Sequence, residues 1–126
     1  MTTKYTNDHE WARVEQGSDI VTIGITDYAQ KQLGDVVFVE LPDVGDSVSA
    51  EDNVAVVESV KAAGDVKAPL DGVVAEVNEE LEDTPELVNE SPTDRGWFYK
   101  VTASSVSDLD SLMDEDAYNA YVESLE

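Results

Sequence analysis

The chain has 126 residues, of which 29 are acidic and 7 basic, and its formal net charge at pH 7 is −22. This length suits one domain with a single modest core, and such a charge should repel nucleic acid and anionic membranes. Because the chain has no cysteine and one histidine, disulfides, thiolate metal sites and clusters of histidine ligands are excluded.

No apolar run approaches the roughly 18–20 residues that span a bilayer, and the chain begins with neither a signal-type nor an arginine-rich transit segment. We therefore expect a cytoplasmic protein that is a monomer when free and has no membrane or nucleic-acid partner. The carboxylates should repel one another and destabilise the fold in dilute buffer. We interpret them as an adaptation to high salt, with a generally acidic, soluble surface as the alternative.

The first part of the chain predicts an extended lead-in, a hairpin and a short helix. Residues 1–8 are polar, and two β-forming runs at 11–15 and 20–25 flank a turn, which predicts a β-hairpin. Thr26 is a suitable N-cap for a helix that ends with Gly34 at the C′ position. A strongly β-forming run over 36–41 follows.

Two similar units flank the middle of the chain. Pro42-Asp43-Val44-Gly45 and Pro69-Leu70-Asp71-Gly72 share the pattern Pro-x-x-Gly, which predicts two interlocked β-sheet halves. Between them, the apolar runs of residues 54–66 are interrupted near Lys61, as in a hairpin with this lysine at its turn. A lysine held on rigid strands suits covalent attachment of a group; the alternative is an ordinary solvated turn lysine.

The last third predicts one core strand and two C-terminal helices. The strand covers 97–101, Ser107 with Asp110 resembles a capping box, and Asp114 is a suitable cap for an amphipathic last helix. No linker divides the chain, so we expect one domain over residues 1–126. Phosphate-binding glycine patterns, calcium-loop spacing and a histidine-based nucleophile are all missing, so we expect no catalytic residues, no metal site and no enzyme activity.

Five blocks are similar to those of one family, the glycine cleavage system H proteins, and together cover nearly the whole chain. The blocks are His9–Trp11, Gly24–Gln30, Leu33–Pro42, Glu58–Ala62 and Glu86–Asn89 through Gly96–Trp97. The resemblance implies a mainly β, biotinyl/lipoyl-type barrel-sandwich hybrid with short helices, including C-terminal ones. It also implies that lipoic acid is joined to Lys61 by a lipoyl- or octanoyl-transferring enzyme.

The resemblance further implies a carrier role in glycine breakdown. Family members take the aminomethyl group of glycine from a pyridoxal-phosphate decarboxylase and pass it to a tetrahydrofolate aminomethyltransferase, and dihydrolipoyl dehydrogenase then reoxidises the arm. Glu10 and Asp65 match positions that hold the loaded arm in a cleft. Their alternatives are an ordinary strand-end acid and a turn former. Glu58 is a contact for the modifying enzyme or a solvated acid, and His9 and Trp11 are expected to pack the first strand.

Other carrier domains also attach a cofactor to a hairpin lysine and remain as alternatives. Biotin carriers have Met-Lys-Met where this chain has Val60-Lys61-Ala62, and acyltransferase lipoyl domains have Asp-Lys-Ala within longer chains. An H-like protein that relays lipoyl groups during cofactor assembly, and an unmodified interaction protein, are the two remaining alternatives.

Overall fold

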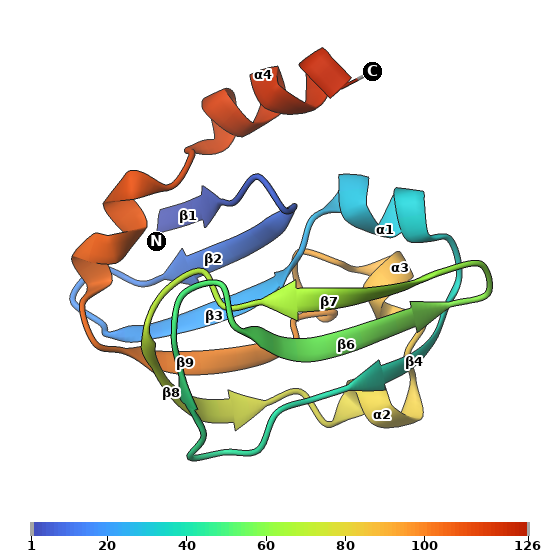
Figure 1. The fold of residues 1–126 in the computed structure, drawn as a ribbon, viewed down its shortest axis with the longest axis horizontal. Coiled ribbons are helices and arrows are strands. Elements are labelled where there is room, and N and C mark those ends of the chain that lie inside the picture. The colour runs from blue at the N-terminus through green and yellow to red at the C-terminus, as the bar shows by residue number, and fades with distance from the viewer. Residues whose placement is uncertain (1, 126) are drawn as a thin grey trace.

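The computed structural model describes residues 2–125, which form two antiparallel sheets with short helices around them (Figure 1). The larger sheet has the strand order β1-β2-β3-β9-β8-β5, and the smaller has the order β4-β6-β7. The strands are β1 (Thr2–Tyr5), β2 (Glu10–Val14), β3 (Ile20–Ile25), β4 (Val36–Glu40), β5 (Ser47–Val48), β6 (Asn53–Ser59), β7 (Ala63–Lys67), β8 (Gly72–Val77) and β9 (Tyr99–Ala103). The helices are α1 (Asp27–Leu33), α2 (Glu80–Asp83), α3 (Leu87–Glu90), the 3₁₀ helix η1 (Val106–Ser111) and α4 (Glu115–Leu125).

The predicted N-terminal hairpin is confirmed, because β2 and β3 pair in an antiparallel register. The lead-in is more ordered than its polar sequence indicated, since β1 adds to the free edge of β2. Trp11 is fully buried and its Nε1 donates a hydrogen bond to the carbonyl of Pro92. A Cβ atom on Gly24 would lie 2.6 Å from the Trp11 ring, so this close packing requires glycine at that position.

Of the three N-terminal helix caps predicted above, two are confirmed. Thr26 Oγ1 accepts from the amide of Ala29 at the start of α1, and Asp114 Oδ1 accepts from the amide of Ala117 at the start of α4. The predicted capping box of Ser107 with Asp110 is wrong. The chain turns there as the 3₁₀ helix η1, and the Ser107 hydroxyl pairs instead with that of Ser105.

The two Pro-x-x-Gly units lead into β5 and β8, which pair with each other. Val48 lies opposite Gly72, and in a matching contact the Gly45 amide donates to the carbonyl of Val74. This reciprocal pairing supports the two related halves predicted from the repeat. The core lies between the two sheets and includes fully or almost fully buried side chains from both: Val21, Ile23, Val39, Val57, Val66, Val74, Phe98, Tyr99 and Val101.

Candidate functional site

Lys61 lies at the tip of a hairpin, as predicted. Strands β6 and β7 pair up to Glu58 and Ala63, and residues 60–62 form the turn. Ser59 closes this turn, because its amide donates to the carbonyl of Ala62 and its Oγ accepts from the Ala62 amide at 3.0 Å. Lys61 is exposed, and none of the three ion pairs formed by residues 2–125 includes it. Its amine is therefore accessible.

The connection from α1 to β4 braces the turn from one side. Gly34 ends α1 with φ 81° and ψ −157°, a backbone conformation that only glycine readily adopts. A Cβ atom at Gly34 would lie 3.3 Å from Cε of Lys61, so the lysine stem passes close to this glycine. The amide of Val60 donates to the carbonyl of Asp35 at 3.0 Å. The position of the lysine is thus set by contacts outside the hairpin as well as within it.

Asn89 on α3 holds this bracing connection in place. Its side-chain oxygen accepts from the amide of Val36 at 2.8 Å, and its side-chain nitrogen donates to the carbonyl of Gly34 and to Oε1 of Gln30. One side chain therefore joins α1, its C-terminal glycine and β4. Sequence reasoning gave Asn89 no role, because its partners lie more than 50 residues away in the chain.

Glu10 lies at the other end of β7 from the turn, and its side chain is buried. Its Oε1 accepts from Thr6 Oγ1 at 2.8 Å, and its Oε2 accepts from the backbone amide of Lys67 at 3.1 Å. Burial raises the pKa of the carboxyl above its usual 4.5, while these two hydrogen bonds act in the opposite direction. Glu10 also lines a cleft of about 630 Å³ between the β1–β2 loop, the end of β7 and the segment after η1.

The structure therefore separates the residues that the sequence grouped as one site. Ala63 and Lys67 are four strand positions apart, or roughly 13 Å, while an extended lysine side chain spans only about 6 Å. The lysine amine alone does not reach Glu10. Asp65 lies between the two ends, exposed and opposite Val56. Glu58 is exposed beside the turn.

An aromatic cluster fixes the loop that precedes Glu10. His9 has φ 68°, and its Nδ1 lies 2.8 Å from the hydroxyl of Tyr118 on α4, which also lies 2.7 Å from Thr26 Oγ1. The His9 ring packs against Tyr28 and Tyr121 as well. Burial lowers the pKa of His9, with Asp8 acting in the opposite direction. The packing role expected for His9 agrees with these contacts.

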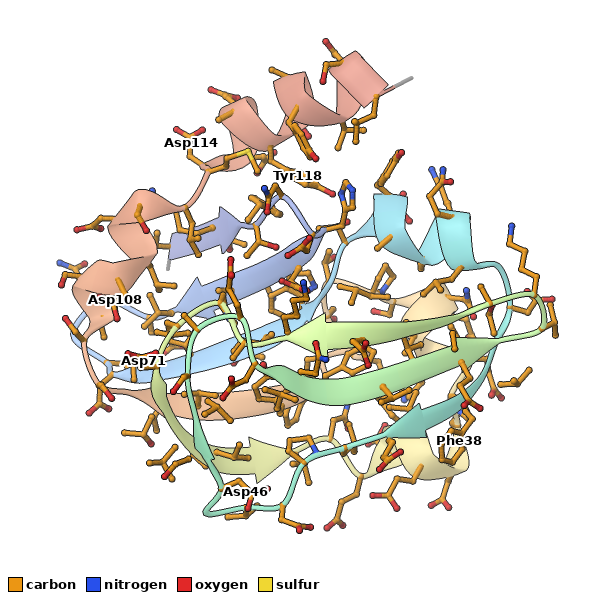
Figure 2. The ribbon with its side chains drawn as sticks, viewed as in Figure 1. Phe38, Asp46, Asp71, Asp108, Asp114 and Tyr118 are labelled. Carbon is orange, nitrogen blue, oxygen red and sulfur yellow. The ribbon has the colours of Figure 1, made fainter. Side chains whose placement is uncertain are left out.

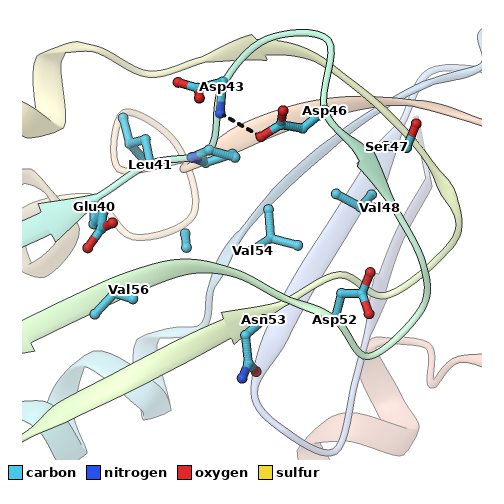
Figure 3. A pocket seen from close by; sticks show the side chains of 12 residues that line it. Glu40, Leu41, Asp43, Asp46, Ser47, Val48, Asp52, Asn53, Val54 and Val56 are labelled. Carbon is cyan, nitrogen blue, oxygen red and sulfur yellow. Dashed lines mark hydrogen bonds between the residues drawn. The ribbon is translucent and has the colours of Figure 1, made fainter.

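A second groove, of about 590 Å³, lies between β5 and the β4–β6 pair (Figure 3). Four carboxylates and several aliphatic side chains line it, and Asp46 accepts from the amide of Asp43 there. Across residues 2–125, no group of three acidic or histidine side chains is arranged to hold a metal ion. None of the helices in that range has the length and apolar character that a membrane span needs. The groove has no basic residue to activate the hydroxyl of Ser47 or to receive a covalent group, so the Lys61 hairpin remains the better candidate.

A rigid antiparallel hairpin that presents one accessible lysine, on two sheets that enclose a single core, defines a carrier domain of the biotinyl or lipoyl class. The family model described as "Glycine cleavage H-protein" matches residues 3–125. The chain therefore belongs to the glycine cleavage H-protein family, and it is a lipoyl carrier of the glycine cleavage system. The family assignment sets aside the biotin carrier and the acyltransferase lipoyl domain.

Individual relatives agree with this assignment. The chain is 61% identical to the glycine cleavage system H protein of Teredinibacter turnerae, over 95% of this chain and 92% of that one. It is 57% identical to that of Parvibaculum lavamentivorans, over 98% and 97%. A crystal structure of an H protein from Mycobacterium marinum superposes with a TM-score of 0.87 at 36% identity and covers 97% of both chains. The predicted barrel-sandwich fold is confirmed.

Proposed function

We propose that lipoic acid is attached to Nζ of Lys61 and that the protein carries the aminomethyl group of glycine between enzymes. The pyridoxal-phosphate glycine decarboxylase loads it, the tetrahydrofolate aminomethyltransferase unloads it, and dihydrolipoyl dehydrogenase restores the disulfide. The main support is the exposed amine of Lys61 on a braced turn. When bound, the lipoyl group supplies the disulfide that takes up the aminomethyl unit.

The turn suits attachment of this group by a lipoyl- or octanoyl-transferring enzyme. The neutral amine of Lys61 attacks the carbonyl carbon of an activated acyl group, an amide bond forms, and the activating group leaves while the nitrogen loses a proton. Small residues at Ala62, Ala63 and Gly64 leave space for the enzyme around the turn. Glu58 is exposed on the same side of the turn as Ala63, its partner across the hairpin, and we assign it a recognition contact.

We assign Glu10 and Asp65 to binding a cation along β7. An extended lipoyl-lysine reaches about 14 Å from the backbone, close to the roughly 13 Å between Ala63 and Lys67. Asp65 would lie beside such an arm, and Glu10 would lie at its end, in the cleft. A carboxylate has about four acceptor positions, and Glu10 uses two of them, so an ammonium group can still bind it.

Reconstitution tests this proposal. The chain is lipoylated, mixed with the decarboxylase, glycine and labelled bicarbonate, and label is measured in the carboxyl group of glycine. We expect exchange with the wild type and none with Lys61→Arg, whose guanidinium does not form the amide. A fully lipoylated wild type that supports no exchange would contradict glycine cleavage and favour lipoyl relay. An unmodified Lys61 in native protein, detected by mass spectrometry, would contradict the carrier function itself.

The role of Glu10 has its own measurement. The aminomethyl-loaded protein is isolated, and release of formaldehyde and ammonia into water is followed with time. Glu10→Ala and Asp65→Ala should each be lipoylated at the wild-type rate but lose the aminomethyl group faster. An unchanged lifetime in either variant would remove that residue from the proposed binding site.

A further inference from the structure

Three large apolar side chains are exposed next to Lys61. Val37 is 53% exposed, Phe38 48% and Val60 70%. They are neighbours in space, because Phe38 lies opposite Glu58 in the sheet and the amide of Val60 donates to the carbonyl of Asp35. We call Val37, Phe38 and Val60 the turn patch. Exposed apolar side chains that are grouped in this way mark interaction surfaces, whereas isolated ones need no explanation.

A β-bulge in β4 creates the patch. The register with β6 shifts between Val36 and Phe38, so Val37 and Phe38 both point outward, while Val36 and Val39 on either side are 4% and 2% exposed. In a regular strand, Phe38 would face the same side as the buried Val36. Bulges that re-aim side chains are frequent beside functional sites. Figure 2 shows Phe38 on β4 beside α2, and it lines a hollow of about 320 Å³ with Leu41 and Glu82.

The charges around the turn patch indicate what it binds. Asp35, Glu40, Glu58 and Glu82 are exposed on or beside the same strands, and Lys61 is the basic residue of the turn. A second copy of this chain, also with a net charge of −22, would meet strong repulsion at such a surface. The complementary partner has an apolar surface surrounded by arginine or lysine side chains.

We propose that the turn patch is the docking surface of the enzyme that acylates Lys61. This inference rests on the proposed function and names the partner of the same site. The acylating enzyme acts on an amine only about 6 Å from the backbone, so its own surface must contact the neighbours of Lys61. Enzymes that act at the end of an arm of about 14 Å can dock farther away. The acylating enzyme is therefore the partner that most needs contacts with residues adjacent to Lys61.

Acylation kinetics test the docking surface. Purified unmodified chain is the substrate of a lipoate–protein ligase supplied with lipoate and ATP, and the initial rate is measured against chain concentration. Phe38→Ser and Val37→Ser should raise KM for the chain by roughly tenfold, the equivalent of about 1.4 kcal/mol of binding, and leave kcat unchanged. Ile20→Ser is the matched control, because Ile20 is 44% exposed on β3 in the other sheet. Its KM should equal that of the wild type.

The outcomes separate the two proposals. Efficient acylation of wild type with unchanged KM in both patch variants would overturn the docking surface and leave the carrier function standing. No acylation of the wild type at Lys61 would overturn both. A wild-type dimer that Phe38→Ser converts to a monomer, measured by sedimentation, would show that a second copy covers the patch and would overturn the inference. A KM that rises with salt in the wild type supports the basic partner surface.

Discussion

The two ends of strand β7 differ in how they are built and in what they can do. At the turn end, Lys61 is exposed, and Ser59, two residues away, closes the turn. At the other end, the amide of Lys67 is held by the buried carboxylate of Glu10, which lies 57 residues away in the chain. The exposed end offers an amine to other proteins, and the buried end offers a fixed acceptor. The proposed function uses both ends, because the arm must be reached by enzymes and also protected between them.

The largest expected effect is a difference in stability between variants at these two ends. Glu10→Ala leaves Thr6 and the Lys67 amide without their acceptor and should lower the free energy of unfolding by about 2–3 kcal/mol. Lys61→Ala removes an exposed side chain and should change it by less than about 0.5 kcal/mol. Urea unfolding followed by tryptophan fluorescence measures both. Equal losses of stability in the two variants would contradict this difference between the two ends of β7.

Asn89→Ala should have the next largest effect and should act on the turn end. It removes the acceptor for Val36 and the donor for Gly34, so we expect a loss of about 1–2 kcal/mol in the free energy of unfolding. Asn119 is exposed on α4, and Asn119→Ala is the matched control, which should not lower the free energy of unfolding because alanine is the better helix former. Unfolding curves for both variants test this prediction. A neutral Asn89→Ala would show that the turn needs no brace from α3.

The sequence predicted features that depend on near neighbours. The Lys61 turn and the Thr26 cap are set by residues within a few positions of one another, and both were confirmed. Gly34 does end α1, but as the C-cap residue, one position before the predicted C′. The bulge at Val37 and the hydrogen-bond partners of Asn89 depend on strands and helices from distant parts of the chain. No local pattern contains that information.

The capping error at Ser107 has a similar physical origin. Ser107 and Asp110 fit the spacing of an α-helical start, but Leu109 is buried in the core, and the segment turns as 3₁₀ helix to place it there. Tertiary packing overrode the local preference. The family resemblance pointed to Glu10, yet only the fold shows that its carboxylate bonds to the amide of Lys67 on another strand.

Salt should stabilise the whole molecule by a smaller amount. With 29 acidic and 7 basic residues, exposed carboxylates repel one another, and the three ion pairs within residues 2–125 have side chains that are 40–68% exposed. Raising KCl from 0.1 M to 2 M should raise Tm by about 3–5 °C, or roughly 1 kcal/mol. The rise should be the same in Glu10→Ala, because that carboxylate is buried. Calorimetric scans test it, and a Tm that does not depend on KCl would contradict salt adaptation.

The smallest effect concerns pH and separates the buried carboxyl from the exposed ones. Burial raises the pKa of Glu10 in the folded protein above its usual 4.5, so the folded state binds this proton more tightly than the unfolded state does. Its contribution to stability is then fully present below 4.5 and is lost as pH rises through the folded-state pKa. Glu10→Gln has no such proton, while all other ionisable groups are common to the two proteins. The free energy of unfolding of the wild type, relative to Glu10→Gln, should therefore fall between pH 4 and pH 7 in urea titrations. A relative rise would mean that the hydrogen bonds from Thr6 and Lys67 outweigh burial, and that Glu10 is already satisfied as an anion without a bound ammonium.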